Sequence, residues 1–205
     1  MAIDEALLEC SATFGKPVLR FYSWSEPAAS FGYFQKYKDV ERLTQLRPLV
    51  RRPTGGGLVP HDADWTYSLI FPPSDPWHSL KAIESYRRVH AWIQEAFAIA
   101  GIAVQLAPEA VPAGAGQCFV GAEKFDVIWK NQKIAGAAQR RTKQGLLIQG
   151  SIQPPPGIAR LDWEVAFREV AGVIWEPLGL DQKFEQNVQE LAATKYSRAT
   201  YNERR

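Results

Sequence analysis

The stretch Arg51-Arg52-Pro53-Thr54-Gly55-Gly56-Gly57-Leu58-Val59-Pro60-His61-Asp62 carries the strongest local signal in the sequence. Two arginines follow the apolar pair Leu49-Val50 and lead into three consecutive glycines. Glycines leave the backbone amides uncovered and make positive φ angles freely available. Such a turn, flanked by arginines, can cradle an anionic or carbonyl-bearing ligand. A plain surface turn between two strands fits the same residues, so this pattern alone leaves both interpretations open.

The residues around this loop predict a sheet. β-forming residues occupy 49–52 before the loop and 65–71 after it, and further strands are predicted at 18–24 and 29–33. We expect the strands on either side of the loop to form a hairpin-like pair that holds it at one end of the sheet. Short turns between neighbouring strands favour antiparallel pairing.

Helical spacing of apolar residues predicts several helices. They are expected at 1–13, at 79–100 with Ser79 as N-cap and Gly101 as stop, and in the C-terminal third at 163–171 and 184–196. Further strands are expected between them, at 104–106, 125–129, 133–141 and 146–153. The predicted fold class is α+β: a mostly antiparallel or mixed central sheet with helices packed on one face. We expect residues 1–205 to form a single catalytic domain without a separate C-terminal accessory domain.

Composition and charge argue against several classes of protein. The net charge of +2 is too small to indicate nucleic-acid binding by itself. The acidic N-terminus is unlike a signal peptide, and no apolar run approaches the roughly 20 residues of a membrane helix. With two cysteines, Cys10 and Cys118, reduced thiols are expected, and no spacing of ligands resembles a metal site. We therefore expect a cytoplasmic, monomeric protein that binds neither membrane nor nucleic acid.

Cys118 and Lys133 are the candidate catalytic residues. Cys118 follows an Ala/Pro/Gly-rich loop, outside any apolar helical face, and Lys133 opens the small-residue segment 134–138. A neighbouring ammonium lowers the pKa of a thiol and so supplies the nucleophilic thiolate. A solvated turn lysine and an unremarkable loop cysteine remain the alternative. His61 can orient a bound carbonyl, or simply close a structural turn with Asp62.

Several motifs, in this order along the chain, resemble the lipoate-protein ligase A family of the biotin/lipoate ligase superfamily. The similarity is greatest to its cysteine-containing octanoyl-[acyl carrier protein]:protein octanoyltransferase branch. Residues 51–62 resemble the RRPTGG…HD loop, residues 133–139 resemble the K-[IV]-[AS]-G-x-A-[QY] lysine signature, and Cys118 lies where that branch has its nucleophile. Residues 1–8, 20–24 and 30–35 resemble the opening helix and the next two strands, and 191–196 and 201–204 the tail.

The resemblance implies the biotin/lipoyl protein ligase fold, which is similar to class II aminoacyl-tRNA synthetases, and an acyltransferase of protein lipoylation. An octanoyl or lipoyl group would pass from octanoyl-acyl carrier protein through acyl-Cys118 to a lysine of a lipoyl-domain protein, such as the glycine-cleavage H protein or a dehydrogenase E2. Neither a cofactor nor a metal would be required. The implied substrate-binding residues are Arg51, Arg52, Thr54, Gly55, Gly56, Gly57, His61, Gly136, Ala138 and Gln149.

Three alternatives stay open. An ATP-dependent lipoate-protein ligase would use ATP and Mg to make an acyl-AMP, and the third glycine, Gly57, is more typical of ligases. Cys118, and the lack of the ligases' Gly-Asn after His61-Asp62, favour transfer. Amidotransfer between carrier proteins also uses a cysteine. A non-catalytic acyl- or lipoate-binding homologue is suggested by Gln149, where the family usually has histidine, and by the lack of a strand before the first helix.

Overall fold

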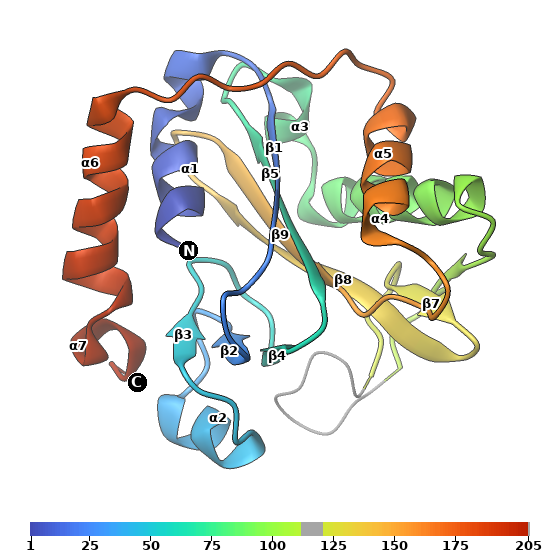
Figure 1. The fold of residues 1–205 in the computed structure, drawn as a ribbon, viewed down its shortest axis with the longest axis horizontal. Coiled ribbons are helices and arrows are strands. Elements are labelled where there is room, and N and C mark those ends of the chain that lie inside the picture. The colour runs from blue at the N-terminus through green and yellow to red at the C-terminus, as the bar shows by residue number, and fades with distance from the viewer. Residues whose placement is uncertain (112–120, 205) are drawn as a thin grey trace.

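The strands form two sheets, a large one that crosses the molecule and a small one below its end (Figure 1). The computed structural model describes residues 1–111 and 121–204. The helices are α1 (Ala2–Phe14), α2 (Tyr37–Leu43), α3 (Pro76–Ser79), α4 (Ala82–Ile99), α5 (Arg160–Val170), α6 (Gln182–Leu191), the π-helix η1 (Ala192–Tyr196) and α7 (Ala199–Asn202). The strands are β1 (Val18–Tyr22), β2 (Ala28–Phe31), β3 (Leu49–Arg51), β4 (Val59–His61), β5 (Trp65–Phe71), β6 (Gln105–Leu106), β7 (Val127–Trp129), β8 (Gln132–Arg141) and β9 (Leu146–Ile152).

The large sheet has the strand order β1-β5-β9-β8-β7-β6, and every neighbouring pair is antiparallel. The predicted α+β class with a mostly antiparallel sheet is confirmed. The β7–β8 ladder is irregular, because Val127 faces Ala135 while Ile128 faces Lys133. Bulges of this kind re-aim the side chains next to them. The irregularity lies directly beside Lys133.

Helices cover both faces of this sheet, so the prediction of helices on one face is wrong. Tyr67, Leu69 and Phe71 of β5 pack in one core with residues of α4 and α5. Ile70, between them, packs with Leu147 of β9 against α1 and α6 on the other face (Figure 1). Every residue of β5 and β9 is buried. Polar and apolar residues alternate in β5 as they do in a half-exposed strand, but the polar ones are buried as well.

The small sheet has the order β3-β2-β4, with β2 parallel to β3 and antiparallel to β4. The predicted hairpin of 49–52 with 65–71 is therefore wrong, because these strands belong to different sheets. The glycine loop instead connects β3 to β4, the two outer strands of the small sheet. Helix α2 closes this sheet through Val40, which packs against Phe31 and Leu49. The loop is thus held at the junction between the sheets.

The start of the long helix differs from expectation. The long helix α4 begins at Ala82, after the separate short helix α3, and its N-cap position is Lys81 instead of Ser79. Asp75 caps α3, which explains why the apolar pattern appeared to start early. Gly101, with a φ of 79°, follows the end of α4 as predicted. Left-handed backbone of this kind favours glycine.

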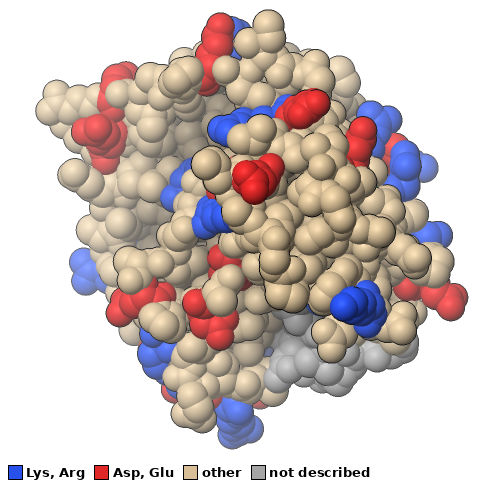
Figure 2. Space-filling view, turned by 45° about the vertical axis from the view of Figure 1, so that its right-hand side comes forward, with Lys and Arg blue, Asp and Glu red and all other residues tan. Residues whose placement is uncertain are grey.

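The C-terminal segment packs on the N-terminal helix (Figure 1). Lys195 Nζ and the Tyr196 hydroxyl both donate to the Glu5 carboxylate of α1, at 2.5 Å and 2.8 Å. Within the described residues, no helix is both long and apolar enough to cross a membrane. Positive and negative side chains are interspersed on the face shown in Figure 2, as expected from the small net charge.

The two-faced sheet predicts that Leu147 is a core residue. Leu147→Ala should lower the free energy of unfolding by about 2–5 kcal/mol, because a fully buried leucine is truncated. Ile174, which is 94% exposed, offers a matched control whose alanine variant should change stability by less than about 0.5 kcal/mol. Urea unfolding measures both. Equal effects of the two substitutions would contradict burial of this face.

Candidate active site

A pocket opens where the small sheet meets the large one. It contains about 480 Å³ of empty space, its open mouth included. Its lining joins both sheets and the glycine loop. The lining residues include Tyr22, Ser30, Arg52, Gly56, Val59, His61, Thr66, Lys133, Gly136, Ala137, Ala138, Gln149, Gly150 and Ser151.

Lys133 lies at one wall of the pocket in a buried ion pair. Its ammonium is 2.7 Å from Asp126 Oδ2, and the two side chains are 7% and 0% exposed. Gly136 makes room for the pair, because a Cβ at this position would lie 2.9 Å from Lys133 Nζ. The lysine signature therefore has a steric basis: the glycine three residues on leaves space for the lysine head group.

Asp126 is held from a second side by helix α4. Its carboxylate accepts hydrogen bonds from the Tyr86 hydroxyl and from the Glu123 amide, the latter at 2.6 Å. Burial, Asp126 and this hydrogen bond raise the pKa of Tyr86 well above its ordinary value, so the hydroxyl keeps its proton and donates. His90 lies 4.1 Å from the Tyr86 ring, and burial lowers its pKa to about 4. The donors that hold the carboxylate of the Lys133–Asp126 pair, the Tyr86 hydroxyl and the Glu123 amide, are thus uncharged.

His61 joins the opposite wall to a chain of buried polar groups. Its Nε2 lies 2.6 Å from Ser30 Oγ, and its Nδ1 lies 2.8 Å from Asp64 Oδ2. The Trp24 ring stacks on the imidazole at 4.1 Å. Burial lowers the pKa of His61 below its ordinary value, although Asp64 opposes this shift. The imidazole is therefore neutral at neutral pH.

The glycine loop is seated by one close backbone contact. A Cβ at Gly32 would lie 1.9 Å from the Gly56 carbonyl oxygen, so residue 32 must be glycine. Gly56 itself has a φ of 83°, which favours glycine at this position too. Arg52 closes the turn from inside, because its guanidinium donates to the carbonyls of Gly55 and Gly57 at 3.0 Å and 2.7 Å.

The two arginines of the motif point in different directions. Arg52 lines the pocket and donates to Ser30 Oγ at 2.9 Å. Arg51 is fully buried and donates to the backbone carbonyls of Tyr33, Gln35 and Asn202. Its guanidinium joins the tail of the chain to β3, and the observed contacts give it a structural role.

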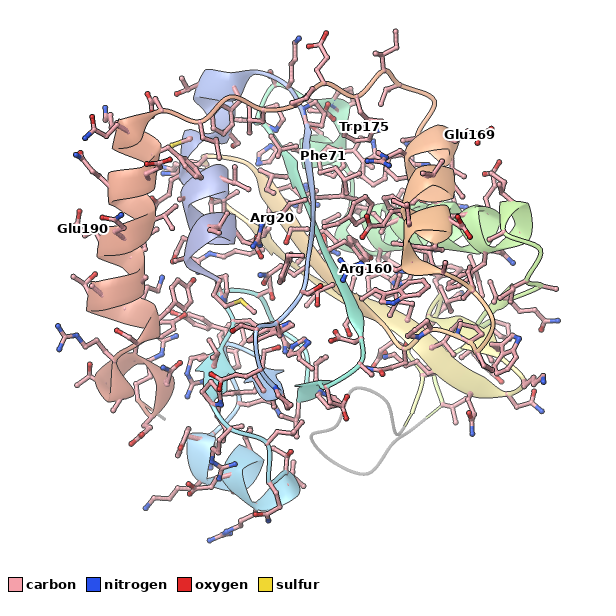
Figure 3. The ribbon with its side chains drawn as sticks, in the orientation of Figure 1. Arg20, Phe71, Arg160, Glu169, Trp175 and Glu190 are labelled. Atoms are coloured by element: carbon pink, nitrogen blue, oxygen red, sulfur yellow. The ribbon has the colours of Figure 1, made fainter. Side chains whose placement is uncertain are left out.

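Gln149 connects the glycine loop to the N-terminal helix. Its Oε1 accepts from the Thr54 hydroxyl at 2.8 Å, and its Nε2 donates to Asp4 Oδ2 at 2.7 Å. Asp4 also accepts from Arg20, which extends from β1 toward α1 (Figure 3). Gln149 therefore takes part in a buried hydrogen-bond network at the position where the family resemblance predicts a histidine.

The structure brings most of the predicted site residues to one pocket. Its lining includes seven of them: Arg52, Gly56, His61, Lys133, Gly136, Ala138 and Gln149. Thr54, Gly55 and Gly57 support the loop through the contacts described above. Cys118 lies outside the described residues, so its predicted role stays a prediction.

Sequence reasoning missed four polar residues of the site: Ser30, Asp64, Thr66 and Ser151. They are all buried, and two of them contact Asp64, whose Oδ2 accepts from Ser151 Oγ at 2.6 Å and from Thr66 Oγ1 at 3.3 Å. Asp62, the expected partner of His61, is exposed instead. The alternation of polar and apolar residues through β5 was the available signal, since buried strands rarely carry unpaired hydroxyls.

The lipoyl protein ligase A/B catalytic domain family matches residues 1–154. The chain belongs to this family. It is 36% identical over 181 residues to "Octanoyltransferase LipM" of Geobacillus kaustophilus and 36% identical over 165 residues to the protein of the same name from Staphylococcus aureus. These matches cover 82% and 74% of this chain, but only 63% and 60% of the relatives' length.

Solved structures share the fold. Protein Ta0514 from T. acidophilum matches with a TM-score of 0.81 and 21% identity over 100% of this chain and 92% of its own. A lipoate-protein ligase A bound with ATP matches with a TM-score of 0.79 and 22% identity over 98% and 92%. A bipartite lipoate protein ligase from Thermoplasma acidophilum, described with its E2 lipoyl domain, matches with a TM-score of 0.73 and 22% identity over 98% and 89%. At these identities the likeness establishes the fold alone.

The buried Lys133–Asp126 pair predicts strongly non-additive stability effects. Asp126→Asn should lower the free energy of unfolding by about 3–5 kcal/mol, because it leaves a buried ammonium without its counterion. Adding Lys133→Met to that variant should restore part of the loss, because both charges are then gone. Urea unfolding of the single and double variants measures the coupling. Additive effects of the two substitutions would contradict the pair.

His90 predicts a specific acid sensitivity. The unfolded chain takes up a proton on this imidazole near its ordinary pKa of 6.5, while the folded protein does so only near pH 4. Stability from this group is therefore full above pH 6.5, falls as the pH drops toward 4 and levels off below. The difference between wild type and His90→Gln in unfolding free energy, followed from pH 7 to pH 4, isolates this slope from the carboxylates. Parallel curves would show that His90 does not contribute.

Proposed function

We propose that this protein is an acyltransferase of protein lipoylation, which moves an octanoyl group from a carrier-protein thioester through acyl-Cys118 to a lysine of a lipoyl-domain protein. The observation that carries the proposal is Lys133, which lies buried in its ion pair at the wall of a pocket that small residues such as Gly136 and Ala138 also line. The name of the two relatives, octanoyltransferase, supports the same reaction.

The pocket suits an unbranched acyl chain. Gly136, Ala138 and Gly150 leave its floor without bulky side chains, and Val59 adds an apolar surface. Burial of about eight methylene-type groups at roughly 0.8 kcal/mol each gives on the order of 6 kcal/mol before ordering is subtracted. This is enough to select an octanoyl or lipoyl chain over a much shorter one.

The first half-reaction loads the cysteine. The Cys118 thiolate attacks the carbonyl carbon of the donor thioester, the old C–S bond breaks, and the carrier protein leaves as a thiolate. The Lys133 ammonium favours the cysteine thiolate and donates to the acyl oxygen. Backbone amides of the glycine loop or near Gly136 supply further donors to the developing oxyanion. Asp126 orients Lys133 for this role.

The second half-reaction releases the acyl group to the acceptor. A lysine amine of a lipoyl-domain protein, such as the glycine-cleavage H protein or a dehydrogenase E2, attacks the acyl-Cys118 carbonyl, and an amide replaces the thioester. One structural neighbour is described together with an E2 lipoyl domain, which supports this class of acceptor. This chemistry requires no ATP.

The proposal predicts an octanoyl adduct on Cys118. Incubation with octanoyl-acyl carrier protein should add one octanoyl mass to the wild type and none to Cys118→Ala, as read by intact mass spectrometry. Cys10→Ala is the matched control, because Cys10 lies in α1 among residues of α6 and does not line the pocket, so the adduct should persist in this variant. Lys133→Ala should slow loading by about 10²–10³-fold, as expected for loss of an oxyanion donor.

The same assay, run with different acyl donors, separates transfer from the alternative reactions. Acylated H protein in place of the carrier-protein thioester tests amidotransfer. Free octanoate or lipoate with ATP and Mg tests ligation, in which pyrophosphate is released and activity survives Cys118→Ala. An intact protein that binds acyl carrier protein but forms no adduct with any donor would be a non-catalytic binding homologue, and the proposal would fail.

A further inference from the structure

The hydrogen-bond chain through His61 has a defined direction. Arg52 donates to Ser30 Oγ at 2.9 Å, so the Ser30 hydroxyl directs its own proton to His61 Nε2 at 2.6 Å. His61 Nδ1–H then donates to Asp64 Oδ2 at 2.8 Å. The Ser151 and Thr66 hydroxyls also donate to this oxygen, which fixes Asp64 as an acceptor. The chain is therefore a hydroxyl, a neutral imidazole and a carboxylate in series.

This chain of hydrogen bonds differs from a purely structural polar cluster because one end of it, at Ser30, lines the pocket. Ser30 and His61 line the same pocket as Lys133, while Asp64 lies behind them and is 9% exposed. A serine hydroxyl has one proton and two lone pairs, and the contacts above use the proton and one lone pair. The second lone pair is available to a group bound in the pocket. Burial excludes bulk water, so proton transfer along the chain has no competing solvent path.

The proposed reaction needs a proton acceptor of this kind. The acceptor lysine, with an ordinary pKa of about 10.4, enters as an ammonium and must lose a proton to attack. Lys133 and Arg52 are cationic donors, already paired with Asp126 and with the loop carbonyls. His61 is neutral at neutral pH, because burial lowers its pKa; Arg52 acts in the same direction, and Asp64 and Asp62 oppose it.

We propose that Ser30, His61 and Asp64 form a proton relay that deprotonates the attacking lysine in the second half-reaction. The inference rests on the proposed function. The amine proton passes to Ser30 Oγ as the Ser30 proton passes to His61 Nε2, and Asp64 stabilises the resulting imidazolium. The amine nitrogen bonds to the acyl carbon, its second proton passes to the Cys118 sulfur as the carbon–sulfur bond breaks, and the relay proton leaves through Ser30 to solvent once the amide product departs. Ser30 is the catalytic residue here; His61 and Asp64 are positioning residues.

The test compares two nucleophiles on the same purified octanoyl-enzyme. A lipoyl-domain protein supplies a protonated lysine, whereas hydroxylamine is already uncharged at neutral pH and needs no relay. In Ser30→Ala and Asp64→Asn the ratio of lysine discharge to hydroxylamine discharge should fall about 100-fold at pH 7. Asp62→Asn, a matched change at the exposed neighbouring aspartate, should leave the ratio at the wild-type value. Rapid quenching and intact mass measure both rates.

A second readout is the pH dependence of lysine discharge. The deficit of both relay variants should shrink as the pH approaches about 10.4, because the lysine then loses its proton unaided. Slowing of both nucleophiles by the same factor, or a deficit that does not change with pH, would overturn the relay and leave a structural role. Failure of the wild type to form any octanoyl-enzyme would overturn the proposed function itself, and the relay with it.

Discussion

The buried carboxylate of Asp4 in α1 is the contact on which the arrangement of the two sheets depends. It is fully buried and accepts from Arg20 of β1 at 2.7 Å and from Gln149 of β9 at 2.7 Å. Gln149 in turn accepts from Thr54 of the glycine loop. A buried charge is tolerated only when it is paired and hydrogen-bonded, so these partners hold one another in place. One helix thereby fixes the position of the loop relative to the large sheet, and with it the width of the pocket.

The wall of the pocket that contains Lys133 follows the same principle, but there the buried charge is a cation and its partner is a carboxylate. There the buried cation is Lys133, the counterion is Asp126, and Tyr86 and the Glu123 amide satisfy the remaining lone pairs. Desolvation makes such a pair a poor source of stability compared with well-packed apolar residues. Its cost to folding is understandable if a fixed ammonium is needed at this point. Gly136, which leaves space for the lysine head group, and the irregular β7–β8 ladder are the backbone features that accommodate this ammonium.

Much of the site was predictable from the sequence, because its two motifs are local. The glycine loop and the lysine signature each specify a short backbone conformation, and both line one pocket. The separation of Arg51 from Arg52 also follows from local geometry, since neighbouring side chains of a strand point to opposite faces. The two-faced helix packing did not follow, because Thr66 and Ser68 gave a buried strand the pattern of a half-exposed one. The partners of His61 and Asp126 depend on tertiary contacts, which spacing along the chain does not encode.

Gln149, where the family resemblance predicts a histidine, has a consequence for how the pocket responds to pH. A neutral imidazole presents one donor and one acceptor, and this is what Asp4 and Thr54 require from residue 149. A glutamine amide satisfies the same two partners, but it does not titrate. The side chain of residue 149 therefore offers the same donor and the same acceptor at every pH. Among the pocket residues that the structure describes, the histidine is His61, whose ring is held between Ser30 and Asp64. The imidazole of this pocket is thus found between Ser30 and Asp64, and not at residue 149.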